Sequence, residues 1–288
     1  MDLTLPSAML SKYGLAPSKQ RGQNFLNDMN VIRKIVDEIA PEPDDVIVEI
    51  GPGFGALTFE LAERARHVIG VELDGGIVRA FGEEYGEDPR ITLVEGDILR
   101  FDLQRILEIH KCERLLVVGN IPYSITSPLI RMLTDMKGVV KRAALMVQSE
   151  VGDRIVARHG DGDYSGFSVV VQYHALARLL FTVKSSCFFP HPKVDSKLVE
   201  LDFERAPRRG SSAEIFETVV QAAFGKRRKM LRRSLDGLLV HHGMTSDELE
   251  AATDIDLKRR GETLDVLEFE AIANALKARG IGTRTTES

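Results

Sequence analysis

A short strand that runs directly into a glycine-rich turn constrains the fold of this chain more than any other feature. Val46–Ile50 is β-branched and apolar apart from Glu49, and the turn Gly51–Gly55 (GPGFG) follows it. The next stretch, Ala56–Arg64, has the apolar spacing of a helix. Glycines allow a tight turn and let backbone N–H groups approach a ligand closely. The pattern therefore predicts a βα unit of a doubly wound sheet with a cofactor at the turn.

The chain up to residue 206 repeats this alternation of apolar runs and helical patterns, which is typical of a parallel α/β sheet. The predicted strands are Val46–Ile50, His67–Glu72, Ile91–Glu95, Leu115–Gly119, Ala143–Val147, Leu179–Val183 and Lys197–Phe203. The predicted helices are Met29–Ile39, Ala56–Arg64, Ile77–Tyr85, Ser127–Met136, Glu150–Arg158 and Tyr164–Ala175. We expect the last two strands to pair across the proline-rich turn Phe189–Pro192.

The strand pattern ends at a basic segment, Arg205–Gly210 (RAPRRG). Residues 211–276 are helical in pattern and are interrupted by Gly225, Gly243 and Gly261. We therefore predict two domains. The first, residues 1–206, contains the sheet, and the second, residues 207–288, is small and all-helical.

Composition excludes several classes of protein. The chain has 288 residues, of which 43% are hydrophobic and 28% charged, as in ordinary globular proteins. Its two cysteines make neither a disulfide framework nor a zinc site, and its apolar runs are too short to span a bilayer. We expect a cytoplasmic protein with no metal and no membrane association. The absence of a coiled-coil pattern favours a monomer.

Charge is distributed unevenly along the chain. The formal net charge of −5 is not typical of a nucleic-acid-binding protein. However, residues 35–110 contain 6 basic and 18 acidic side chains, whereas residues 184–234 contain 12 basic and 6 acidic ones. Residues 226–233 (KRRKMLRR) hold six of these cations. A dense cationic segment is suited to phosphate contacts, although a solvated helix would show the same pattern. The predicted RNA-contacting residues are Lys226, Arg227, Arg228, Lys229, Arg232 and Arg233.

Acidic residues end the two strands that follow the glycine turn. Glu72 ends the second strand, 17 residues beyond Gly55, and Asp97 follows the third. An acidic residue at the first position accepts hydrogen bonds from ribose hydroxyls, and one at the second suits an adenine amino group. A dinucleotide site more often has the spacing G-x-G-x-x-G, with room for a pyrophosphate. The tighter turn suits a cofactor without phosphate, such as S-adenosylmethionine, while a nicotinamide cofactor remains the alternative.

The fourth strand ends in Asn120-Ile121-Pro122-Tyr123. An exocyclic adenine amine is a poor nucleophile, because its lone pair is delocalised into the ring. An amide oxygen and a backbone carbonyl can accept its two N–H bonds and draw the nitrogen towards tetrahedral geometry. Pro122 restricts the backbone of Ile121 and so fixes the direction of a carbonyl, and Tyr123 offers a flat face for a base. The turn predicts methyl transfer to an amine.

Together these motifs identify a family. The chain resembles the ribosomal small-subunit adenine dimethyltransferases (KsgA type) from about Lys19 to about Leu239. The matching elements are Gln23–Leu26 (QNFL), Glu49–Gly55, Glu72, Gly96-Asp97, Asn120–Tyr123, Phe188–Ser196 (FFPHPKVDS) and Phe224–Leu231. The chain has Arg233 where the family usually has Asn. The resemblance implies a class I S-adenosylmethionine-dependent methyltransferase with a Rossmann-like, seven-stranded, mostly parallel sheet and a small helical C-terminal domain.

The resemblance also implies the roles of individual residues. Asn24 and Leu26 would line the methionine side of the cofactor above Gly51, with Glu72 on the ribose and Asp97 on the adenine. The full implied cofactor set is Asn24, Leu26, Gly51, Gly53, Glu72, Asp97, Ile98 and Asn120. Asn120 and the Ile121 carbonyl would hold the target amine, and Tyr123 and Phe188 would stack on the two faces of the base. The full implied catalytic set is Asn120, Ile121, Pro122, Tyr123 and Phe188.

The implied reaction is N6-dimethylation of two adjacent adenosines in a loop near the 3′ end of 16S rRNA, within an immature small ribosomal subunit. Three alternatives stay open at this point. They are a large-subunit adenine methyltransferase, a non-catalytic assembly factor on the same fold, and a nicotinamide oxidoreductase. The low pI of 5.9 speaks against the first. The complete set of site residues speaks against the second, and the Asn120–Tyr123 turn offers no hydride chemistry for the third.

Overall fold

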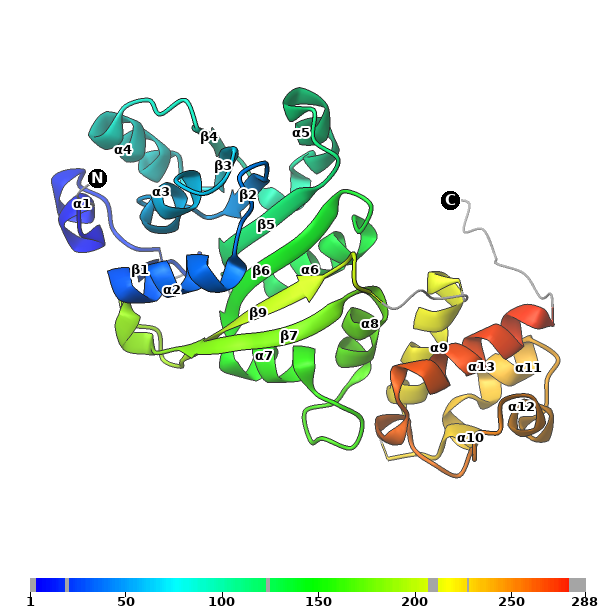
Figure 1. Cartoon of the computed structure of the whole chain (residues 1–288). Coiled ribbons are helices and arrows are strands. Elements are labelled where there is room, and N and C mark those ends of the chain that lie inside the picture. Colours follow the sequence, from blue (N-terminus) through cyan, green and yellow to red (C-terminus); the bar gives the residue numbers. More distant parts are fainter. Residues whose placement is uncertain (1–3, 19–20, 123–124, 207–211, 227, 280–288) are drawn as a thin grey trace. The chain divides into compact units, whose positions relative to one another are not determined.

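The computed structural model describes residues 4–18, 21–122, 125–206, 212–226 and 228–279. The chain divides into two compact units (Figure 1). The first contains residues 1–152 and 175–205, and the second contains residues 153–174 and 206–288. No helix within the described residues is long and apolar enough to cross a bilayer.

A seven-stranded sheet forms the centre of the first unit, in the order β4-β3-β2-β5-β6-β9-β7 (Figure 1). All neighbouring strands pair in parallel except at β9, which runs antiparallel to both of its neighbours. The strands are β2 (Val46–Ile50), β3 (His67–Glu72), β4 (Ile91–Glu95), β5 (Leu115–Asn120), β6 (Val140–Gln148), β7 (Leu176–Val183) and β9 (Ser196–Asp202). The expected seven-stranded, mostly parallel α/β fold is confirmed.

Helices cover both faces of this sheet. The helical elements of the first unit are α1 (Pro6–Lys12), α2 (Met29–Ile39), α3 (Ala56–Ala62), α4 (Gly75–Tyr85), η1 (Ile98–Arg100), α5 (Leu103–His110), α6 (Thr126–Asp135) and η3 (Ser185–Cys187). Helix α2 is amphipathic: it buries Ile32, Ile35, Val36 and Ile39 against α3 and one face of the sheet. Asp28 caps it, because its carboxylate accepts from the N–H groups of Asn30 and Val31. The short helices α1 and α5 were not predicted, although Asp102 is the N-cap of α5 and Pro6 begins α1.

A two-stranded antiparallel ladder lies beside the large sheet. Strand β1 (Phe25–Leu26) pairs with β8 (Phe188–Phe189), so that Phe25 lies opposite Phe189 and Leu26 opposite Phe188. Two residues are too few to show a strand pattern in the sequence, and this pairing was not predicted. It attaches the segment before α2 to the proline-rich turn, and therefore fixes the backbone directly after Asn24.

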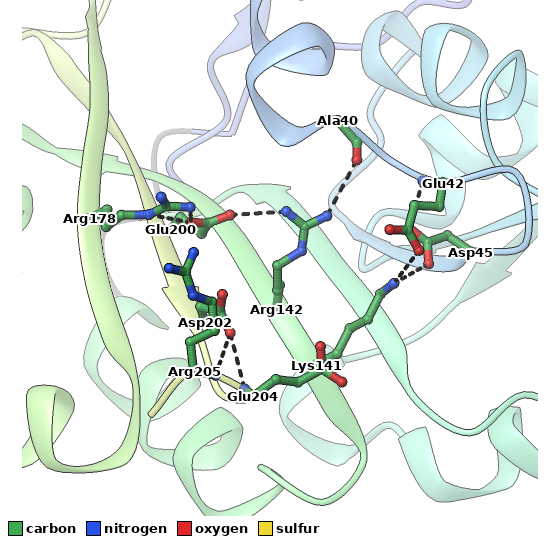
Figure 2. A network of polar contacts seen from close by, with 10 residues as sticks. All are labelled: Ala40, Glu42, Asp45, Lys141, Arg142, Arg178, Glu200, Asp202, Glu204 and Arg205. Carbon is green, nitrogen blue, oxygen red and sulfur yellow. Dashed lines mark hydrogen bonds and ion pairs between the residues drawn. The ribbon is translucent and has the colours of Figure 1, made fainter. Parts of the chain in front are cut away.

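A buried ionic network ties strands together at the start of β6 (Figure 2). Glu200 on β9 is almost fully buried and accepts from Arg178 on β7 (2.8 Å) and from Arg142 on β6 (3.2 Å). Arg142 also donates to the carbonyl of Ala40 at the end of α2. A buried carboxylate needs such partners, since an unpaired charge is costly to desolvate. The network lies at the amino end of β6, away from the carboxyl ends of the parallel strands.

The described residues of the second unit form helices and connecting turns without a strand, and they have their own core. Its helices are α8 (Gly166–His174), α9 (Ala213–Gly225), α10 (Leu231–Ser234), α11 (Asp236–His241), α12 (Ser246–Thr253), η4 (Gly261–Thr263) and α13 (Val266–Ala278), while α7 (Ser149–Val156) spans the division. Phe216, Leu249 and Phe269 are fully buried in this core. Thr245 and Asp265 begin α12 and α13 as capping boxes.

The division between the units differs from the predicted domains in one respect. The prediction placed all of residues 1–206 in the sheet domain, whereas residues 153–174 pack with the helical unit. The reason is their apolar side chains: Tyr173 stacks on Phe216 with ring centroids 3.8 Å apart, and the Tyr164 hydroxyl donates to the Leu264 carbonyl at 3.0 Å. The second boundary, between Arg205 and Ala206, lies one residue from the predicted one.

Candidate active site

A cavity of about 240 Å³ opens at the carboxyl ends of β2, β3, β4 and β5. This edge is where ligands bind in doubly wound sheets. Seven of the eight predicted cofactor residues line it, namely Asn24, Gly51, Gly53, Glu72, Asp97, Ile98 and Asn120. The eighth, Leu26, lines a smaller cavity of about 40 Å³ that shares Gly51, Gly53 and Asn120 with the first. Pro122 from the predicted catalytic set also lines the larger cavity.

The glycine turn forms the floor of this cavity. Gly51, Gly53 and Gly55 have φ values of 64°, 58° and 85°, which favour glycine. Gly53 also has no room for a side chain, because a Cβ there would lie 2.9 Å from the ring of Phe25. The turn therefore needs glycine for its backbone angles and for its close contact with the segment before α2.

Glu72 is held by backbone donors at the end of β3. The N–H of Asp74 donates to Oε1 at 3.0 Å, and the N–H of Gly53 donates to Oε2 at 3.3 Å. Burial raises the pKa of Glu72, although these two donors oppose the shift. The carboxyl is thus oriented by the glycine turn and by α4, and each oxygen retains lone pairs for further donors, such as vicinal hydroxyls.

Asp97 and Ile98 form the wall beyond β4. Asp97 is the N-cap of η1, and its Oδ1 accepts from the Leu99 N–H at 3.0 Å. Its Oδ2 lies 3.9 Å from Nε of the exposed Arg100, and the Asp97 side chain is 40% exposed, so this oxygen is accessible to a ligand. Ile98 is buried and adds an apolar surface to the cavity. A polar acceptor beside an apolar wall suits a heteroaromatic ring with an amino group.

Asn120 ends β5 at the mouth of the same cavity. Its Nδ2 donates to the main-chain carbonyl of Asn24 at 2.6 Å. Within the described part of the chain, its Oδ1 has no hydrogen-bond partner, so an acceptor is available. The Ile121 N–H donates to the Met146 carbonyl at 3.0 Å, which continues the β5–β6 pairing and fixes the peptide before Pro122. Tyr123 lies outside the described residues.

Comparison with known proteins decides the family. The model of the family described as "Ribosomal RNA adenine dimethylase" matches residues 16–272 of this chain. The chain belongs to the ribosomal RNA adenine dimethylase family. It is 39% identical over 271 residues to a protein named ribosomal RNA small subunit methyltransferase A of Alkaliphilus oremlandii, and the match covers 93% of this chain and 94% of that protein.

Solved structures support the fold of this dimethylase. A dimethyladenosine transferase from Plasmodium falciparum superposes with a TM-score of 0.75 at 23% identity, over 89% of this chain and 98% of that one. The 23S rRNA methyltransferase ErmE superposes with a TM-score of 0.63 at 27% identity, over 87% and 100%. The fold is that of a class I methyltransferase, and the cofactor of this family is S-adenosylmethionine.

The lining of the dimethylase cavity fits this cofactor. S-adenosylmethionine carries a cationic sulfonium, ribose hydroxyls and an adenine amino group. The cavity offers a buried carboxyl at Glu72, a second carboxylate at Asp97 and, among the described residues, no phosphate-binding cation deep in the turn. Arg21 also lines the cavity, but it is ion-paired with Asp74. When bound, the cofactor supplies an electrophilic methyl group, and the protein supplies hydrogen-bond acceptors and negative charge.

Phe188, the predicted second face for the target base, lines neither of these two cavities, and its stacking role stays a prediction. The side chain is 1% exposed and packs in the core with Leu26 and Leu198. The cause is the β1–β8 ladder, in which Phe188 lies opposite Leu26 and turns inwards. Phe189, its neighbour, packs instead near Phe25 and Phe54.

The basic segment, residues 226–233, does not form one continuous helix. Helix α9 ends at Gly225, and α10 begins only at Leu231. Arg228 in the intervening turn has a φ of 68°. Arg232 has ionic partners, Asp247 at 2.8 Å and Glu250 at 3.4 Å. Arg228, Lys229 and Arg233 are exposed and have no ionic partner within the described residues; Arg227 lies outside them.

Glu49 lies at the site, but no role was predicted for its side chain. It lies on β2, is 2% exposed and lines the smaller cavity. Its Oε2 has no hydrogen-bond partner within the described residues. Burial and, secondarily, the neighbouring charge of Glu72 raise the pKa of Glu49 to about 7. The available signal was a carboxylate inside an otherwise apolar buried strand, which is rare without a function.

This raised pKa predicts a pH-dependent stability. Below pH 4.5 Glu49 is protonated in both the folded and the unfolded chain. As pH rises from 4.5 to 7, the unfolded chain loses this proton first, so the free energy of unfolding falls by about 3 kcal/mol and then levels off. Glu49→Gln should abolish this component. Urea unfolding of both proteins without cofactor at pH 4 and pH 8 measures it, and an equal pH response in both would contradict the assignment.

Proposed function

We propose that this dimethylase transfers methyl groups from S-adenosylmethionine to N6 of two adjacent adenosines in a loop near the 3′ end of 16S rRNA, twice on each. The observation that carries the reaction type is Asn120, whose amide ends β5 at the cofactor cavity with its Oδ1 available. The small-subunit substrate is supported by the name of the 39%-identical relative. We further propose that the reaction belongs to small-subunit biogenesis.

The chemistry requires acceptors rather than a strong base. Asn120 Oδ1 and the Ile121 carbonyl accept the two N–H bonds of the target amine and orient its lone pair towards the methyl group. Bound S-adenosylmethionine would supply the methyl group to this nitrogen and leave as a neutral thioether, and the proton lost from nitrogen would pass to solvent. Negative charge from Glu72 and Asp97 favours the cationic cofactor over this neutral product, which promotes exchange between rounds.

The target base must leave its stack to reach Asn120. Flipping a base costs a few kcal/mol and costs least when the base is unpaired, so a loop adenosine is a better substrate than one in a duplex. Tyr123 is the proposed stacking platform, because its position follows Pro122 directly. Stacking on one aromatic ring contributes about 1–3 kcal/mol, which offsets much of this cost.

The helical unit is the proposed RNA-contacting part of the enzyme. Its exposed cations Arg228, Lys229 and Arg233 are available for phosphates, together with Lys226 and Arg227, whereas the carboxylates of α12 neutralise Arg232.

We propose that the enzyme acts as a monomer on the immature small subunit, and a ribosomal substrate implies a cytoplasmic location.

Charge-neutralising substitutions should distinguish the cations that contact RNA from the ion-paired Arg232. Lys229→Gln with Arg233→Gln should weaken RNA binding and reduce the slope of log K against log salt by about 2, since each phosphate contact contributes about 1. Arg232→Gln should change the slope by less than a single such contact, because its guanidinium is already paired. Filter binding to small-subunit RNA between 50 and 300 mM salt measures both. A larger slope change for Arg232→Gln would reverse the assignment.

Transfer of label tests the function directly. The purified enzyme is incubated with methyl-labelled S-adenosylmethionine and small subunits from cells that lack this methylation, and the RNA is digested to nucleosides. Labelled dimethyladenosine near the 3′ end is the expected result. Large-subunit RNA is supplied in a parallel reaction. If only that RNA is labelled, the substrate is large-subunit and not small-subunit RNA. Tight subunit binding without label or cofactor binding would favour an assembly factor.

A further inference from the structure

The segment Arg21–Leu26 connects three parts of the candidate site, and we refer to it as the bridging segment. Its first residues are attached to α4, because Arg21 forms an ion pair with Asp74 and Gln23 Nε2 donates to Asp74 Oδ2 at 3.1 Å. Its last two residues form β1 and pair with β8. Between these anchors, the carbonyl of Asn24 accepts from Asn120 Nδ2 at 2.6 Å.

This last hydrogen bond determines which end of the Asn120 amide faces the reaction. A side-chain amide has a donor group, NH₂, and an acceptor, oxygen, on opposite sides of the same carbon. The Asn24 carbonyl is only an acceptor, so it selects Nδ2 and repels Oδ1. With Nδ2 occupied, Oδ1 is directed away from the bridging segment and remains without a partner within the described residues. The target amine donates hydrogen bonds, so it needs Oδ1 of Asn120, and not Nδ2, to face it.

The position of the Asn24 carbonyl depends in turn on Gln23. The Gln23 side chain uses both of its polar atoms: Nε2 donates to Asp74, and Oε1 accepts from the Ser18 N–H at 2.7 Å. Asp74 is itself fixed, because its Oδ1 accepts from the Gly76 N–H at 3.0 Å and caps α4. Although burial opposes it, hydrogen bonds from Gln23 and Gly76 and the charge of Arg21 lower the pKa of Asp74, so this acceptor is ionised.

We propose that Gln23 and Asp74 are positioning residues for methyl transfer, which act through the Asn24 carbonyl to fix the amide orientation of Asn120. This inference deepens the proposed function and rests on it. Neither residue needs to touch the target amine. Gln23 and Asp74 hold the bridging segment at the β3 side of the cavity, and Asn24 transmits that position to the β5 side, where the reaction occurs.

An exchange of the two polar partners tests the proposal. Gln23→Glu places a carboxylate against Asp74, and Asp74→Asn removes the ionised acceptor while Oδ1 can still cap α4. Each single substitution should lower kcat about tenfold, because a charge-assisted hydrogen bond is lost. The double variant restores a donor facing an acceptor, since the amide introduced at position 74 can donate to the carboxylate introduced at position 23. It should recover kcat to within about threefold of wild type. In the double variant, which has the net charge of wild type, the affinity for S-adenosylmethionine, measured by calorimetry, should change by less than about threefold, although Gln23 lines the cofactor cavity.

A second variant reads the amide orientation itself. In Asn120→Asp, an ionised carboxylate places an oxygen against the Asn24 carbonyl, whereas the protonated form donates to it and still offers an acceptor to the amine. Turnover of this variant should therefore rise, relative to wild type, as pH falls from 8.5 to 5.5. A general structural role would not produce this inverted pH profile.

Wild-type enzyme in the same assay distinguishes a failure of the proposed function from a failure of the positioning role. If wild type leaves adenosine unlabelled, the proposed function fails. If wild type is active, three results would each overturn the positioning role: single variants within twofold of wild-type kcat, a double variant no better than the singles, or an Asn120→Asp profile parallel to that of wild type. If one single variant does not fold, as judged by thermal unfolding, the comparison of the other single variant with the double variant decides the role of Gln23 and Asp74, and the pH profile tests the Asn120–Asn24 hydrogen bond through which they act.

Discussion

Asn120→Ala should reduce the rate of methyl transfer by about 10³-fold and leave the affinity for S-adenosylmethionine within about threefold of wild type. Loss of one preorganised polar group at a reacting centre typically costs 10²–10³-fold in kcat. Here alanine removes the acceptor for the target amine and also the donor to the Asn24 carbonyl, so the upper end of that range is expected. Single-turnover transfer to RNA, with cofactor binding measured separately, gives both quantities.

The matched control is another asparagine of the same unit. Asn30→Ala lies on the exposed side of α2, away from both cavities, and should leave transfer unchanged. A rate for Asn120→Ala within a few-fold of wild type would remove this side chain from the chemistry. Equal losses of transfer and of cofactor affinity would assign Asn120 to cofactor binding instead.

Much of the fold could be predicted because its signals are local. The strand Val46–Ile50 and the glycine turn identify the first βα unit, and the strand boundaries follow apolar runs that end in Glu72, Glu95 and Asn120. Parallel strands bring their carboxyl ends to one edge. Residues that are far apart in the sequence, such as Gly51 and Asp97, therefore line one cavity as expected.

The remainder depended on contacts that no local pattern reveals. Phe188 reads as an aromatic before a proline turn, and only its pairing with Leu26 shows that it turns into the core. The basic segment has helix-forming residues, yet helix α9 ends at Gly225, before the segment begins. The contacts of Arg232 with α12 involve residues 15 and 18 positions away in the sequence. The hydrogen bond from Asn120 to Asn24 spans 96 residues and is likewise invisible in the sequence.

Glu72→Ala should weaken binding of S-adenosylmethionine by about 10³-fold, or about 4 kcal/mol, because hydrogen bonds to a charged group contribute about 1.5–3 kcal/mol each and vicinal hydroxyls make two. The same change removes the acceptor of the Gly53 and Asp74 N–H groups, which loosens the turn that forms the cavity floor. Calorimetric titration measures the affinity.

The neighbouring strand supplies the matched control for Glu72. Glu95 lies opposite Glu72 in the β3–β4 pairing and has the same charge, but it is exposed and does not line the cavity. Glu95→Ala should therefore bind the cofactor as wild type does. If both alanine variants lost affinity equally, the effect would be the general negative field at this edge of the sheet. A large loss confined to Glu72→Ala requires direct contact, and Glu72→Gln, which keeps one oxygen but not the charge, should then fall between the two.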